Sequence, residues 1–189
     1  MKKARIEISN FLIVGGLMGL WGCNNAGQNK STDNSMRSDT VSVSITQDDR
    51  KFMLTAAQIN LLEIQVGKLA QQRGMSTDVR QMGKMLEDDH SKLWNELVEL
   101  AKRKSVTLPS ALDNNSQNDY DKLSNQKDAD FDKSFTTAMV DGHKDAILLF
   151  QNEAKETKDD DLGKWATQTQ PVLQKHLEQA QALNDKIKS

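Results

Sequence analysis

The chain has 189 residues but only one cysteine, two prolines and no excess of basic side chains. A single cysteine, Cys23, excludes a disulfide framework and any site built from several thiolates. The formal net charge is −2 at pH 7, and 102–104 is the only basic cluster. Nucleic-acid binding requires a basic stripe, so we exclude nucleic acid as a partner. No grouping of Ser, His and Asp indicates nucleophilic catalysis, and we expect a non-enzymatic protein.

Cys23 directly follows a short apolar run at the N-terminus. Basic residues within 2–5 precede an uncharged run over 11–21, the layout of a secretory signal. The segment from Leu20 to Cys23 resembles a bacterial lipoprotein signal, which implies lipid on Cys23, a membrane partner and a cell-envelope location. Asn24 is not the aspartate that retains many lipoproteins at the inner membrane, so we expect the outer membrane, facing the periplasm. The alternative is an ordinary cleaved signal with a chance cysteine.

Composition divides the chain into three segments. The signal covers 1–22, and 23–47 is rich in Asn, Ser, Thr and Asp. This second segment has too few large apolar residues to bury a core, so we expect a disordered, lipidated tether. In 48–189, apolar residues recur three or four positions apart, which predicts amphipathic helices in one domain. We expect long helices over 48–73, 76–104, 128–157 and 160–187, and room for a short helix near Asp119–Ser124.

The connections between these helices predict the topology. Thr46 and Asp49 fit a capping box at the start of the first helix, and Pro171 should kink or split the last one near Gln168. The segment 105–127 is long enough to run the length of a bundle. One such crossover is typical of ferritin-like proteins, whereas an up-down-up-down bundle would need only a short loop. The predicted fold is therefore all-α, a ferritin-like four-helix bundle with a long crossover between its second and third long helices.

All three histidines lie on apolar helix faces, near the middle of three different helices. They are His90, His143 and His176, and Glu63 has the same kind of position on the first helix. In a bundle of similar antiparallel helices, mid-helix positions meet at one level. The sequence therefore predicts an inward polar layer with one member from each long helix.

Two interpretations of this layer compete. The four side chains could hydrogen-bond one another and set the register of the helices, or they could bind a transition metal such as zinc, iron or copper. Glu87 stands three residues before His90, the spacing of di-iron bundles, and joins the candidate metal ligands. The second half of that motif is missing, because position 173 is Leu173. The sequence favours the structural interpretation, disfavours a di-iron centre and leaves a mononuclear site open.

Short motifs follow one another along the whole helical region. They are Asp49-Arg50-Lys51-Phe52, Ala56-Ala57, Asn60, Glu63, Gly67-Lys68-Leu69-Ala70, Asp89-His90, Leu108-Pro109, Phe131-Asp132, Met139, His143, Leu149-Phe150 and Pro171-x-Leu173-x-x-His176-Leu177. In their order and spacing these motifs resemble the bacterial domain-of-unknown-function 4142 family of exported or outer-membrane proteins. The resemblance implies a ferritin-like fold and an envelope location, and no activity. The family's recurring polar positions correspond to the four members of the inward layer. We expect a non-enzymatic binding or interaction module of unknown ligand, with a metal-binding protein as the alternative.

Overall fold

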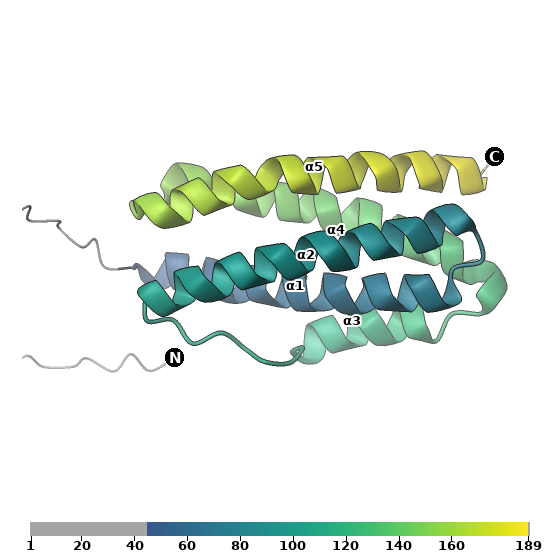
Figure 1. Ribbon diagram of the computed structural model, residues 1–189, viewed down its shortest axis with the longest axis horizontal. Coiled ribbons are helices and arrows are strands. Elements are labelled where there is room, and N and C mark those ends of the chain that lie inside the picture. The colour runs from purple at the N-terminus through teal and green to yellow at the C-terminus, as the bar shows by residue number, and fades with distance from the viewer. Residues whose placement is uncertain (1–44, 189) are drawn as a thin grey trace, which may run out of the picture. The chain divides into compact units, whose positions relative to one another are not determined.

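The computed structural model describes residues 45–188, and these residues form five helices and no strand (Figure 1). The predicted signal, the lipidation residue Cys23 and nearly all of the tether lie outside the described residues. None of the helices within 45–188 combines the length and apolar character needed to cross a membrane. The helices are α1 (Gln47–Arg73), α2 (Thr77–Arg103), α3 (Asn114–Ser124), α4 (Asp128–Glu156) and α5 (Asp160–Lys188).

The all-α prediction is confirmed, but the described region has five helices and not four. The four long helices begin and end within one residue of their predicted positions. The fifth, α3, lies in the crossover and starts earlier than the short helix expected near Asp119–Ser124. Its start has a local cause, because the Asp113 carboxylate accepts a hydrogen bond from the backbone N–H of Ser116 (2.8 Å) and caps the first turn.

Pro171 does not split α5, contrary to one of the two outcomes predicted for it. The helix continues from Asp160 to Lys188 without a break. Pro171 and Thr167, whose carbonyl loses its helical partner, are both exposed, so water can replace the missing donor. Trp165 and Leu173 are buried on either side of the proline and hold both halves of the helix against the core.

The long helices pack as two antiparallel pairs, α1 with α2 and α4 with α5. Contacts between α1 and α4, and between α2 and α5, join the pairs. The crossover returns along the length of the helices, so that α2 and α4 run in the same direction (Figure 1). The short helix α3 lies against α1 and α4. The long crossover predicted from the sequence is therefore present, and it adds a helix outside the α1–α4 groove.

Hydrogen bonds from α1 fasten the crossover at both ends of α3. The Arg73 guanidinium donates to the backbone carbonyls of Ser124 and Gln126, just after α3. Gln58 bonds the backbone at 111–113, just before α3, with its amide as donor to one carbonyl and its oxygen as acceptor from one N–H. These bonds fix the position of α3 relative to α1.

The two helices of the first pair touch backbone to backbone where Gly67 crosses Gly83. A Cβ atom at Gly67 would lie 2.6 Å from the carbonyl oxygen of Gly83, and the reverse substitution meets the carbonyl of Gly67 at the same distance. Only glycine fits at both positions. This close approach sets the spacing of α1 and α2 next to the polar layer.

A buried carboxyl pair lies at the end of the molecule where α1 starts. Thr46 and Asp49 form the predicted capping box. Burial pushes the pKa of Asp49 upward, but hydrogen bonds from Thr46, Thr157 and Glu153 outweigh it and lower the pKa. Burial, with the neighbouring Asp49, raises the pKa of Glu153 to about 8. Glu153 is therefore largely protonated at neutral pH.

The apolar core consists of two clusters, separated by the polar layer. One cluster contains Phe52, Leu97, Phe150 and Trp165. The other cluster contains Phe131 and further large apolar side chains. On α1 the polar residues of this layer fall between the buried apolar residues Ala57 and Val66, and the histidines interrupt the other three long helices at corresponding places. The buried polar side chains of this layer are Asn60, Glu63, His90, His143 and His176.

Candidate metal centre

Three histidines from three helices meet in the middle of the bundle. His90 comes from α2, His143 from α4 and His176 from α5, and each is at most 1% exposed. One ring nitrogen of each lies within 4.8 Å of the corresponding nitrogens of the other two. Among residues 45–188 this is the only group of three or more potential metal ligands of the His, Cys, Asp and Glu type at such spacing. We call these three residues the His triad.

Asn60 determines which nitrogen of His90 carries the proton. The Asn60 amide nitrogen donates to the carbonyl of Ala56 (2.9 Å), so its oxygen faces His90 Nδ1 (3.0 Å). An amide oxygen can only accept, and Nδ1 therefore carries the hydrogen. The lone pair is left on His90 Nε2, which is buried and has no hydrogen-bond partner.

The backbone of α4 determines the protonation of His143. Its Nδ1 lies 2.9 Å from the carbonyl oxygen of Met139, one turn earlier. Since a peptide carbonyl only accepts, Nδ1 is the donor and the lone pair is on Nε2. The helix therefore directs an unprotonated nitrogen of His143 toward the other two rings.

Asp89 determines the protonation of His176 from the opposite side. His176 Nε2 donates to the Asp89 carboxylate (3.1 Å). Burial pushes the pKa of Asp89 upward, but hydrogen bonds from His176 and Lys92 lower it overall, so the carboxylate is ionised and accepts. The lone pair of His176 is then on Nδ1.

His143 Nε2 and His176 Nδ1 are 3.3 Å apart. In the neutral form of the rings, which is the form that binds metal, the outer hydrogen bonds place the proton of each ring on the other nitrogen, so that three lone pairs converge. Two imidazole nitrogens bound at 2.0–2.1 Å to one tetrahedral zinc are separated by about 3.3–3.4 Å. Hydrogen bonds that hold the outer nitrogen of each ring are the usual support of histidine metal ligands.

Burial keeps two of the rings neutral at physiological pH. It lowers the pKa of His90 well below its usual value, and the charges that His176 and His143 would carry lower it further. Burial also lowers the pKa of His176 to about 4, although its hydrogen bond to Asp89 acts in the opposite direction. Neutral imidazole is the form that binds metal, so protons compete little for these two nitrogens at pH 7.

Glu63 lies beside the His triad but outside it. Its side chain is 6% exposed and its Oε2 is buried without a partner. Burial raises the pKa of Glu63, and the attraction of His143 opposes this. Glu63 therefore interacts electrostatically with His143. It is not among the residues whose ligand atoms lie within 4.8 Å of one another.

The structure places Glu87 away from the His triad. Its carboxylate accepts from the Gln71 amide (2.7 Å) and pairs with Lys68 (3.7 Å), both on the surface of α1. The side chain of Glu87 is 29% exposed. Although Glu87 lies three residues before His90, its side chain faces the edge of the α1–α2 interface. The structure therefore does not bring Glu87 and His90 together as ligands of one metal.

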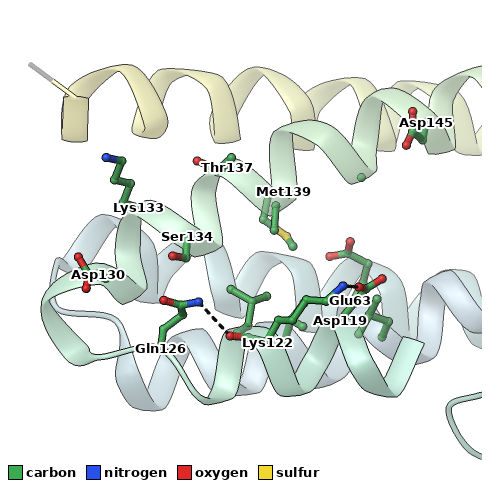
Figure 2. Close-up of a pocket in the computed structure, with 15 residues that line it drawn as sticks. Glu63, Asp119, Lys122, Gln126, Asp130, Lys133, Ser134, Thr137, Met139 and Asp145 are labelled. Carbon is green, nitrogen blue, oxygen red and sulfur yellow. Dashed lines mark hydrogen bonds and ion pairs between the residues drawn. The ribbon is translucent and has the colours of Figure 1, made fainter. Parts of the chain in front are cut away.

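A cavity of about 750 Å³ opens beside Glu63 between α1, α3 and α4. Met139 also lines it, and in Figure 2 the Met139 side chain extends toward Glu63. Charged side chains from α3 and α4 form part of the lining, among them Lys122, Asp130 and Asp145. The polar layer thus borders a solvent-filled pocket on the α1–α4 side.

Sequence reasoning identified the three histidines but missed the residues that orient them. Asp89 was not assigned to the polar layer, whereas its carboxylate bonds His176. Asn60 is nearly as buried as the histidines and was not assigned to the layer. The available signal was its position one turn before Glu63 on the apolar face of α1.

Residues 35–183 match the family described as Domain of unknown function (DUF4142), and the chain belongs to this family. The resemblance seen in the sequence is thereby confirmed. No curated protein and no solved structure matches the chain. Since the family description states no activity, function has to be argued from the site.

Proposed function

We propose that this protein is a cell-envelope lipoprotein whose helical domain binds one transition-metal ion through His90, His143 and His176. The supporting observation is that one ring nitrogen of each histidine lies within 4.8 Å of the other two, while a hydrogen bond on the far side of each ring holds its orientation. A ligand with positive charge satisfies all three lone pairs at once. The role is one of binding, and the domain performs no catalysis by itself.

The proton positions favour metal binding over the structural interpretation of the layer. A purely structural layer requires its members to hydrogen-bond one another. Here His90 Nε2 has no partner, and the 3.3 Å contact of His143 with His176 has no proton to share when both rings are neutral. An unpaired buried polar atom costs about 1–3 kcal/mol, so a layer serving stability alone would be better satisfied by other residues.

The set of ligands suits Zn(II) best among the common ions. Three imidazoles with an open fourth position are the arrangement of mononuclear zinc sites, and copper and iron also accept nitrogen ligands. The four long helices with their long crossover suggest a ferritin-like bundle, but the residues do not fit a di-iron centre. Such a centre needs several bridging carboxylates. Here Glu63 lies beside the triad, and the other neighbouring carboxylate, Asp89, is bonded to the outer nitrogen of His176.

A metal titration tests this function. Full-length protein with Cys23→Ser, which offers no competing thiol, is titrated with Zn(II) and Co(II) while tryptophan emission, Co(II) absorption and Tm are followed. We expect one ion per chain, and stabilisation by about 2.7 kcal/mol when free ion is about 100 times Kd. For a domain of this size that corresponds to about 5–10 °C in Tm.

Variants of the triad supply the controls for the titration. His90→Ala and His143→Ala should abolish binding, whereas Asn184→Leu, which removes a buried polar side chain of α5, should leave it intact. The absence of stoichiometric binding for every ion tested contradicts the proposed function. Equal stabilisation of the parent and His143→Ala would assign the effect to other surface groups.

Anchoring is tested separately from metal binding. Cys23→Ser should move the protein from the membrane fraction to the soluble fraction, because two or more acyl chains are needed for stable attachment. Retention of the variant in membranes to the same extent as the parent argues against lipid on Cys23. Sucrose-gradient separation of the parent's inner and outer membranes then checks the proposed outer-membrane location.

A further inference from the structure

Two sides of the His triad lead toward solvent, and they differ in charge. On the side between α2 and α5, the triad presents the Nε2–H group of His176, which donates to Asp89. The ammonium groups of Lys92 and Lys175 flank the same carboxylate at 3.3 and 3.5 Å. A cation approaching from this side meets two positive charges and a ring nitrogen that presents a proton.

The side between α1 and α4 presents the opposite chemistry. Here the buried Glu63 carboxyl lines the 750 Å³ cavity and has an oxygen without a partner. The lining also carries three aspartates and two lysines, and one of these lysines, Lys122, is neutralised by Asp119 at 2.6 Å. Clefts with an excess of one charge raise the association rate of ions of opposite charge.

We infer that the cavity between α1, α3 and α4 is the path by which a divalent transition-metal cation reaches the His triad, and that Glu63 passes the cation to His143. Glu63 is suited to this step because its side chain lines the cavity, one of its oxygens is buried without a hydrogen-bond partner, and it lies close enough to His143 for the two side chains to interact. A carboxylate binds zinc or copper with oxygen and releases it to a stronger nitrogen site. This inference rests on the proposed function, since a path matters only if the triad binds metal.

Stopped-flow mixing with Zn(II) tests the role of Glu63. The full chain with Cys23→Ser is compared with the same chain carrying Glu63→Gln, which keeps the shape and removes the charge. We expect association to slow by about tenfold or more, with release slowed in parallel and Kd little changed. An unchanged association rate overturns the assignment, and so does a faster release alone, which would make Glu63 a ligand of the bound ion.

Gly142 allows the cavity to be narrowed without disturbing the triad. It lines the cavity on α4, and a Cβ atom there would find open space within 4 Å. Gly142→Leu should slow association and release by the same factor, while Gly142→Ala serves as the matched small control. Equal rates for the Leu and Ala variants would show that the cation enters elsewhere.

The charged side chains that line the cavity allow a third test of the path. Asp145→Asn removes a carboxylate from the cavity, and Asp185→Asn removes one from the exposed end of α5. We expect a slower association for the first variant, confined to low ionic strength, and parental rates for the second. If both variants slowed association equally, the attraction of the cation would depend on the net charge of the protein alone, which contradicts a path through the cavity. Failure of the proposed function appears earlier, as absence of Zn(II) binding at equilibrium in the parent.

Discussion

Asn60→Leu should disorganise the His triad without changing any metal ligand. Leucine has the same branching as asparagine but cannot accept the hydrogen from His90 Nδ1, which the Asn60 oxygen now does at 3.0 Å. His90 then has two choices. It keeps a buried N–H without a partner, or it moves the proton to Nε2, the nitrogen that faces the other histidines.

Each choice has a measurable magnitude. An unpaired buried donor costs about 1–3 kcal/mol of unfolding free energy, so urea denaturation of the metal-free variant should show a loss in that range. A proton on Nε2 must leave before the metal binds, and loss of a supporting hydrogen bond typically weakens metal affinity about 10–100-fold. The tautomer itself is visible in the ¹⁵N chemical shifts of the imidazole nitrogens.

Two further variants separate this effect from general destabilisation. Asn60→Asp keeps an acceptor for His90 and should retain the Nδ1–H tautomer and most of the affinity. Asn184→Leu also removes a buried asparagine side chain, one that accepts from the hydroxyls of Thr136 and Thr137, and should lower stability with little change in Zn(II) affinity. If Asn60→Leu binds Zn(II) as tightly as the parent, the assignment of proton positions in the triad is wrong.

Two other predictions concern stability. Gly67→Ala should destabilise by about 1–3 kcal/mol, because its Cβ would lie 2.6 Å from the carbonyl of Gly83, whereas Gly142→Ala should stabilise by about 0.5–1 kcal/mol; urea denaturation compares them, and equal effects would contradict the close crossing. The folded state holds a proton on Glu153, whose pKa is raised to about 8, while the unfolded chain releases it near the ordinary glutamate pKa of 4.5. Stability should therefore fall by about 1–3 kcal/mol as pH rises from 5 to 8. Glu153→Gln should flatten this part of the profile, and an unchanged pH slope would assign the loss to other groups.

The helices could be predicted because their signals are local. Apolar residues three or four apart, the Thr46–Asp49 capping box and the turn at Gly74 act within a few positions of each other. The start of α3 in the crossover was harder to predict. This helix begins at an N-cap formed by Asp113, and many aspartates in loops do not start a helix. The unbroken course of α5 through Pro171 also depends on packing, which overrides the local cost of the proline.

The partners of the histidines could not be predicted in the same way. Asn60 and His90 are 30 residues apart, and Asp89 and His176 are 87 apart. Which of several polar side chains reaches an imidazole depends on the register between helices. A shift of one helical turn would bring a different side chain to the imidazole. The expected pairing of Glu87 with His90 failed for this reason, since Glu87 faces Gln71 on a neighbouring helix.

The all-helical fold and the inward placement of the three histidines follow from the sequence, because periodicity along a helix decides which face is buried. The sequence also predicts the lipid on Cys23. The tertiary structure was needed to show that one ring nitrogen of each histidine lies within 4.8 Å of the others, and that a cavity opens beside Glu63. The position of a proton on an imidazole depends on an acceptor about 3 Å away, and that acceptor usually belongs to another turn or another helix.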